Sequence, residues 1–256
     1  MAATWQSPKV SGNLWGLHHR HSLRSPRQCA HWLAMTAFLG SVIAVDLDVI
    51  VGQVAAPGGG SAFAVIEVDE DVDGDTSTND MVTVLANGMA GNPEITAEGP
   101  AFDAFMEALN TITVYLCRCI AGDGEGATKL LECQVTGAKT EAAAKTVAKS
   151  VICSSLTKAA MFGADANWGR VLCAIGYSGA DVDVEKVDVS FHSPKGTIQV
   201  CKDGTGVDFS EELAKEILLE SSIDIVIALN DGEGAATAWG CDLTYDYVKI
   251  NGDYRT

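Results

Sequence analysis

Segments with helical and with strand-like spacing of apolar residues alternate along most of the chain. Residues 100–120 predict a helix, because Phe102, Phe105, Met106 and Leu109 fall on one face. Residues 140–155 predict a second helix, with Thr140 as N-cap and Val147, Val151 and Ile152 on its apolar side. The other expected elements are a helix at 209–220 and strands at 49–51, 63–66, 81–88, 129–135, 184–191, 196–201 and 222–229. This mixture indicates layers of α/β or α+β type.

Charge is unevenly distributed over the chain. With 256 residues and 47% hydrophobic content the chain can bury a substantial core, and its net charge is −17. Residues 1–45 contain four bases and no acid, so the remainder is more acidic than the total. Such an acidic body repels nucleic acid and anionic membranes. We therefore expect a soluble protein with small-molecule or protein partners.

The first 45 residues differ from the rest and are treated as a separate segment, with residues 46–256 as the folded domain. They hold four of the five histidines and end in an apolar run at 33–45. That run is too short to span a bilayer but has the length of a signal-peptide core, and the acid-free stretch before it suits an organellar transit peptide. The alternative is a faulty gene model in which this segment encodes nothing folded.

Eight cysteines are scattered along the chain, several of them inside apolar runs. This distribution is typical of reduced, buried thiols rather than of a disulfide framework. The one tight pair, Cys117 and Cys119, has no second pair at zinc spacing. We expect no metal site built from cysteines.

Residues 69–80 imitate a calcium-binding EF-hand loop. Acids occupy loop positions 1, 3, 5 and 7, glycine position 6, Ser77 position 9 and Asp80 position 12. An EF-hand also needs an entering helix, whereas residues 57–68 are glycine-rich and then strand-like. An acidic calcium-binding module therefore stays an alternative rather than the main interpretation.

A pentapeptide, Asp-Gly-Glu-Gly-Ala, occurs at 123–127 and again at 231–235. Two glycines around an acid suit a tight turn that presents a carboxylate and backbone amides at a site. Two unrelated acidic turns would give the same pattern.

Five segments in order resemble one protein family. They are Asp73–Asp80 (DGDTSTND), Asp123–Lys129 (DGEGATK), Ser154–Ala160 (SSLTKAA), Asn167–Arg170 (NWGR) and Ala238–Asn251 (AWGCDLTYDYVKIN). Together they resemble the carboxyl-terminal, nucleophile-bearing half of ornithine acetyltransferase, the glutamate N-acetyltransferase of arginine biosynthesis. The closing motif is most similar to plant and algal members.

This resemblance implies an α/β fold, layered as an αββα sandwich, and an acyltransferase that needs no metal or organic cofactor. The family moves an acetyl group from N-acetylornithine to glutamate, and some members also use acetyl-CoA. Its chain cuts itself before a threonine, which then forms the acyl-enzyme, since the freed amine can act as its base. The expected partners are the amino-terminal alpha chain and further copies of the enzyme. The expected location is the chloroplast, with mitochondrion or cytoplasm as alternatives.

The resemblance also assigns residues. Glu125 is the substrate-site carboxylate, and Asn251 and Thr256 close the pocket over the substrate. Lys129 is either an ion-pair partner near Glu125 or a solvated strand end. Trp168 and Arg170 are expected to be structural.

The amino-terminal part departs from the family pattern. The nucleophile of the family lies in an M-A-T-M-L segment preceded by K-G-S-G, whereas Thr36 follows methionine and lacks that preceding stretch. Thr36 is thus a candidate by position alone, and the family's oxyanion-hole threonine and glycine have no counterpart here. Three alternatives stay open: a catalytically incomplete fragment, the calcium module, and a self-cleaving amidohydrolase or aminopeptidase of related architecture.

We expect calorimetric titration of the purified chain with calcium to show no micromolar binding, because the loop lacks an entering helix. Micromolar binding that Asp71→Ala abolishes would instead establish the calcium module.

Overall fold

The computed structural model describes residues 42–46, 49–53, 63–66, 81–85 and 95–253. Its first sheet consists of β1 (Val42–Asp46), β2 (Val49–Gln53), β3 (Phe63–Ile66) and β4 (Met81–Leu85) in the order β1-β2-β4-β3. The strands expected at 49–51 and 63–66 are therefore confirmed. Of the segment expected at 81–88, residues 81–85 form β4, and residues 86–88 lie outside the described residues. β1 crosses the division expected after residue 45, and that division stays a prediction.

The second sheet is mixed and has six strands. They are β5 (Leu130–Ala138), β6 (Asp188–Ser193), β7 (Gly196–Lys202), β8 (Thr205–Gly206), β9 (Ser222–Ala228) and β10 (Gly234–Cys241). Their order is β10-β5-β9-β6-β7-β8, with β5 and β9 parallel and the other neighbours antiparallel.

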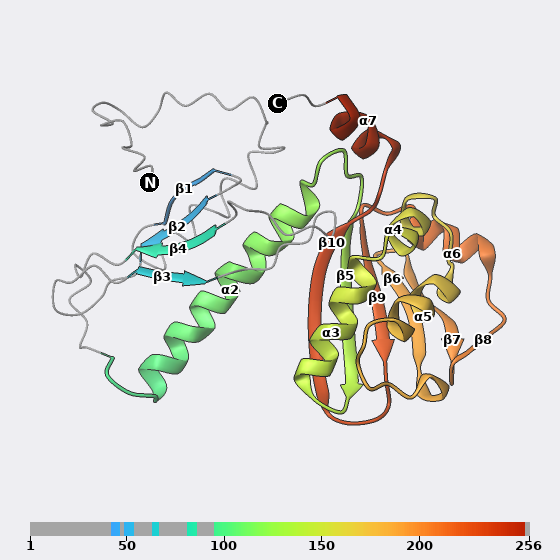
Figure 1. Cartoon of the computed structure of the whole chain (residues 1–256), viewed down its shortest axis with the longest axis horizontal. Coiled ribbons are helices and arrows are strands. Elements are labelled where there is room, and N and C mark those ends of the chain that lie inside the picture. The colour runs from blue at the N-terminus through green and yellow to red at the C-terminus, as the bar shows by residue number, and fades with distance from the viewer. Residues whose placement is uncertain (1–41, 47–48, 54–62, 67–80, 86–94, 254–256) are drawn as a thin grey trace, which may run out of the picture.

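Helices complete the α/β architecture (Figure 1). They are α2 (Pro100–Gly122), α3 (Glu141–Ile152), α4 (Ser155–Phe162), α5 (Trp168–Gly176), α6 (Glu211–Leu218) and α7 (Tyr245–Asp253), with a 3₁₀ turn η1 (Val184–Lys186). Helices α3 to α6 lie on one side of the six-stranded sheet, and α2 approaches it at β10 and β5. The α/β fold class is confirmed.

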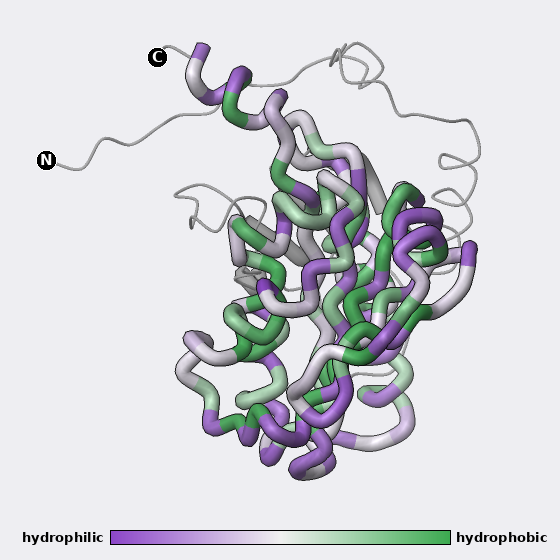
Figure 2. Tube along the Cα trace, turned by 90° about the vertical axis from the view of Figure 1, so that its right-hand side faces the viewer, coloured by the Kyte–Doolittle hydropathy of each residue, from purple (hydrophilic) through white to green (hydrophobic). Residues whose placement is uncertain are grey.

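The main core lies between the six-stranded sheet and helices α3 to α6. Every second residue of β9, and of β5 as far as Val135, is buried there, including Leu131 and Ile225. The helices carry hydrophobic and hydrophilic residues in turn, as Figure 2 shows for those that face the viewer. Apolar residues recur every second position in the strands and about every 3.6 positions in the helices, so each element buries one face.

The opposite face of the sheet carries a polar row. Paired positions on five neighbouring strands hold Trp239, Glu132, Asp224, His192 and Thr197. Burial, followed by the charge of Glu132, raises the pKa of Asp224. This face is therefore polar, half-buried at Trp239, Glu132 and Asp224 and exposed at His192 and Thr197.

Helix α2 is long and apolar enough to cross a membrane, by length and composition only. Its predicted apolar face, Phe102 to Leu109, is half-buried. Its last turns contact β10 and β5, and Arg118 forms an ion pair with Glu132 on the polar face of the sheet. In this structure, α2 is thus docked on the sheet through its carboxyl-terminal end.

Two predicted elements are each divided into two in the structure. The helix expected at 140–155 starts as predicted, with the Thr140 hydroxyl accepting from Ala143 N at 3.1 Å, but it ends at Ile152. Ser154 then caps a separate helix, α4, by accepting from Thr157 N. The strand expected at 184–191 begins only at Asp188, because the Asp183 side chain accepts from Glu185 N and starts a 3₁₀ turn.

The Trp168 ring packs directly against Gly206. A Cβ at Gly206 would overlap the indole ring, whereas a Cβ at Gly176, in the last turn of α5, would meet nothing within 4 Å. Trp168 thus joins α5 to the end of the sheet, which confirms its predicted structural role.

We expect Gly206→Ala to destabilise the fold by about 1–3 kcal/mol, because the added methyl group must displace a packed ring. Gly176→Ala is the matched control and should be neutral or slightly stabilising, since it lowers the entropy of the unfolded chain in a helix. Urea unfolding followed by circular dichroism measures both. Equal urea midpoints for the two variants would show that the Trp168 ring moves aside at no cost in stability.

Candidate functional site

Glu125 lies in the loop that joins α2 to β5, and glycine allows this loop to approach α7. Gly126 has φ of 67°, and a Cβ there would come within 2.9 Å of Tyr247 N and 3.0 Å of the Asp246 Cβ. A side chain at this position would be strained by its backbone conformation and would also push α7 away. The glycine after Glu125 is therefore required by both geometry and packing.

The buried carboxylate of Asp242 ties this loop to the end of β10. One oxygen accepts from Thr128 N at 2.8 Å and Lys129 N at 2.9 Å, and the other accepts from the Thr128 hydroxyl. The register places Cys241 opposite Leu130, so Asp242 reaches the backbone just before β5. Three donors, two of them backbone amides, satisfy a carboxylate that is 3% exposed.

Lys129 differs from both predictions made for it. Its side chain is buried, and its ammonium group donates to the carbonyls of Met161 and Phe162 at the carboxyl end of α4. Burial lowers the pKa of Lys129, and the charge of Asp242 opposes that shift. It is neither a solvated strand end nor in contact with Glu125, and it stabilises a helix terminus.

Thr244 occupies the N-cap position of α7. Its hydroxyl donates to Gly126 O at 2.8 Å and accepts from Tyr247 N at 3.1 Å. The Tyr245 ring that follows packs edge-on against Phe162, with ring centroids 5.5 Å apart. The first turn of α7 is thus anchored to the Glu125 loop and to α4.

Two residues that sequence resemblance placed in the substrate site meet in the structure. The Asn251 side-chain amide donates to the Glu125 carboxylate at 2.7 Å and to Tyr247 O at 3.1 Å. Both side chains are exposed, so solvent or a small molecule can reach them. Thr256 and Thr36 lie outside the described residues.

The two copies of the pentapeptide lie at opposite ends of one strand pair. The first precedes β5 and the second precedes β10, and these strands are antiparallel, with Cys241 opposite Leu130 and Gly234 opposite Ala138. They therefore form no common site.

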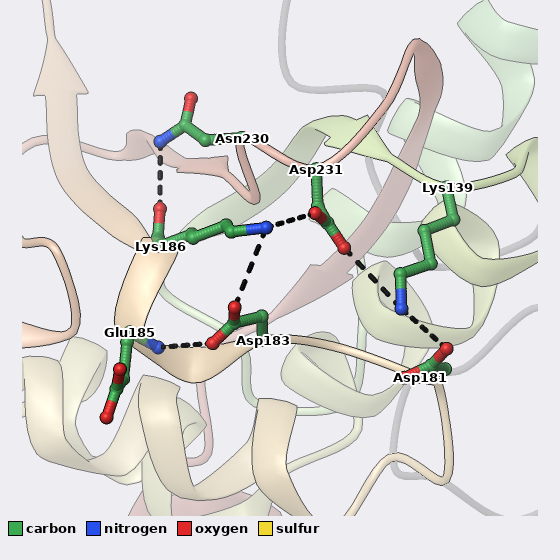
Figure 3. Close-up of polar contacts among 7 residues, drawn as sticks. All are labelled: Lys139, Asp181, Asp183, Glu185, Lys186, Asn230 and Asp231. Carbon is green, nitrogen blue, oxygen red and sulfur yellow. Dashed lines mark hydrogen bonds and ion pairs between the residues drawn. The ribbon is translucent and has the colours of Figure 1, made fainter.

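The second copy belongs to a network of ion pairs among loops (Figure 3). Asp231 pairs with Lys186 and, at 3.5 Å, with Lys139, which also reaches Asp181 at 2.6 Å. The hydrogen bond from Lys186 is the main reason why the pKa of Asp231 is lowered. This copy joins three loops structurally, as an unrelated acidic turn would.

Arg170 also has a structural place. Its guanidinium donates to Leu156 O at 2.9 Å and so links α5 to α4, while Asn167 caps α5 by accepting from Arg170 N. The prediction that Arg170 is structural is confirmed.

Within the part of the chain that the structure describes, no group of three or more His, Cys, Asp or Glu residues could hold a metal ion. The seven cysteines in that part form no disulfide, and Cys133, Cys201 and Cys241 are buried. Burial raises the pKa of the Cys133 thiol well above its usual range, which keeps it unreactive. The calcium-like loop at 69–80 lies outside the described residues.

Comparison with protein families finds the ArgJ family over residues 57–256. The chain belongs to the ArgJ family. The arginine biosynthesis bifunctional protein ArgJ 1 of Clostridium acetobutylicum is 55% identical over 185 residues, which are 72% of this chain and 45% of the relative. The ArgJ protein of Caldanaerobacter subterraneus subsp. tengcongensis is 56% identical over 185 residues, 72% of this chain and 46% of the relative.

A crystal structure of the arginine biosynthesis bifunctional protein ArgJ from Bacillus halodurans matches with a TM-score of 0.67 and 49% identity. The matched residues make up 72% of this chain and 84% of the solved chain. This match confirms the α/β fold of the ArgJ type. The chain spans about half the length of the curated relatives that it matches.

Sequence reasoning missed Asp242 and Thr244, although both lie in the closing motif. A signal was present, because a carboxylate and a hydroxyl stand beside the apolar strand 234–241 and must find partners if buried. Their partners Thr128 and Gly126 are more than 100 residues away in sequence, so only the fold identifies these contacts.

We expect Asp242→Asn to lower the free energy of unfolding by about 2–3 kcal/mol, because the amide group faces a donor and the charge-assisted bonds to Thr128 and Lys129 are weakened. Urea unfolding measures the loss. The matched control is Asp208→Asn, at an exposed acid before α6. Equal stability of the two variants would contradict a clamping role for Asp242.

Proposed function

We propose that this chain provides the amino-acid binding part of an ornithine acetyltransferase. The complete enzyme transfers an acetyl group from N2-acetyl-L-ornithine to L-glutamate through an acyl-threonine, as an acyltransferase of arginine biosynthesis. The contact of 2.7 Å between Asn251 and Glu125, in a chain of the ArgJ family, carries this proposal.

The chemistry of the two side chains fits these substrates. Acetylornithine and glutamate both carry an ammonium group and a carboxylate. The exposed Glu125 carboxylate can hold an ammonium group, and the Asn251 amide can both donate and accept. One polar site can therefore receive donor and acceptor in turn.

The transfer takes two balanced steps. The threonine oxygen attacks the acetyl carbon, the amide bond breaks, and the ornithine nitrogen leaves with the proton of the hydroxyl. The glutamate amine then attacks the threonine ester, and the proton it loses returns to the hydroxyl. Free ornithine and N-acetylglutamate are the products, and the threonine is regenerated.

The second chain and self-cleavage are part of the proposal. Residues matched to this chain make up 84% of the solved Bacillus halodurans chain but 45% of the Clostridium acetobutylicum relative. The solved chain is thus about half as long as that relative, which supports an enzyme assembled from an amino-terminal alpha chain and a carboxyl-terminal chain like this one. Further copies are expected to form a homo-oligomer.

Two finer features are proposed on narrower grounds. Use of acetyl-CoA as a second acetyl donor agrees with the word bifunctional in the names of the relatives. A chloroplast location, with mitochondrion or cytoplasm as alternatives, rests on the basic, acid-free residues 1–45. Imaging of these residues fused to a fluorescent protein tests the location, and a fusion that stays outside plastids would exclude it.

A catalytically incomplete fragment is the second candidate. The sequence around Thr36 supports it, because the residues that surround the nucleophile of the family are missing there. Such a fragment would keep the fold and the Glu125–Asn251 contact but would form no acyl-enzyme.

We expect the chain, when it is co-expressed with the amino-terminal alpha chain of an ArgJ relative and given N-acetylornithine and glutamate, to release ornithine and to gain the mass of one acetyl group. Glu125→Gln should lower kcat/KM by about 100-fold, because a charged contact to the substrate ammonium is lost. Glu233→Gln is the matched control, since Glu233 occupies the same place in the second Asp-Gly-Glu-Gly-Ala turn and is also exposed. Its activity should equal that of the parent.

A folded chain that, together with the alpha chain, neither turns over nor gains an acetyl group would favour the incomplete fragment. Turnover that Glu125→Gln and Glu233→Gln reduce equally would contradict the assignment of Glu125.

A further inference from the structure

Helix α7 carries Asn251 but is weakly held by hydrophobic packing. None of the side chains of Tyr245–Asp253 is buried, and Tyr245 and Val248 are well exposed. The position of Asn251 relative to Glu125 must therefore depend on contacts at the start of the helix.

Beside the ring contact of Tyr245 with Phe162, two hydrogen bonds of a single hydroxyl group, that of Thr244, hold the start of α7. Thr244 is 5% exposed, donates to Gly126 O at 2.8 Å and accepts from Tyr247 N at 3.1 Å. The carbonyl belongs to the residue after Glu125, and the amide lies one helical turn before Asn251. One hydroxyl thus joins the backbone of both sides of the candidate site.

We propose that Thr244 is a positioning residue that sets the alignment of Glu125 and Asn251. This inference rests on the proposed function for its effect on substrate, although the link between loop and helix is independent of it. Thr244 touches neither side chain of the pair and acts through the backbone on each side. Its loss lets the first turn of α7 fray and moves Asn251 away from Glu125.

Two substitutions separate the hydroxyl from the shape of the residue. Thr244→Val keeps a β-branched side chain but removes the hydroxyl and with it the hydrogen bonds to Gly126 O and from Tyr247 N. Thr244→Ser keeps the hydroxyl and removes only a methyl group. Thr146→Val is the matched control, because Thr146 is exposed on α3 and its hydroxyl bonds to Ala142 O of its own helix.

The experiment combines amide hydrogen exchange on the full chain with steady-state kinetics on the full chain co-expressed with the alpha chain of an ArgJ relative. In Thr244→Val, exchange at Tyr247 N should be about tenfold faster, as expected for the loss of a helix cap, and KM for glutamate should rise about tenfold. The change in kcat should stay within about twofold, because the lost interaction holds substrate and transition state alike. Thr244→Ser should restore both values, and Thr146→Val should match the parent.

Failure of this inference differs from failure of the proposed function. A parent chain without any acetyl transfer would overturn the proposed function. Amide hydrogen exchange at Tyr247 N would then be the one test of the positioning role of Thr244. Parental exchange at Tyr247 in Thr244→Val, or equal impairment of the Ser and Val variants, would overturn the positioning role. In an active parent, faster exchange with an unchanged KM would also overturn it.

Discussion

A buried carboxylate needs donors, and the position of Asp242 follows from that requirement. Its oxygens accept from the backbone and the hydroxyl at the start of β5, so the end of β10 cannot separate from that segment without leaving an ion unpaired in the interior. The chain leaving Asp242 continues into Thr244 and α7, and the chain entering Thr128 comes from Glu125. Both parts of the candidate site therefore extend from one clamp.

Much of the fold could be predicted from local pattern. The alternation in 222–229 and the N-cap at Thr140 depend on near neighbours, and strand β9 and the start of α3 appear where they were expected. The predicted start of the strand at 184–191 was wrong, because the Asp183 side chain accepts from Glu185 N and so favours a turn over extended backbone there. Helices α4 and α5 were not predicted, since at eight and nine residues they are too short to show a periodic pattern.

The site was predictable in part, and through resemblance rather than periodicity. Glu125 and Asn251 were named from motifs, and the structure brings them together. Lys129 was misjudged, because a lysine at a strand end is usually solvated and nothing nearby in sequence shows that the end of α4 needs a cation. Contacts between residues this far apart depend on sheet order, which no local pattern specifies.

The register between β5 and β10 fixes which residues pair and also how many residues separate the last pair from α7. Cys241 lies opposite Leu130, and the irregularity in this ladder lies at its far end, between Gly234 and Ala236. A slip of one residue would move α7 by roughly 3.4 Å along the strand and turn alternate side chains to the other face. An extra residue accommodated at the irregular end would leave the spacing at the Glu125 end unchanged. Changes in chain length are thus far less disruptive in the turn before β10 than between Cys241 and Thr244.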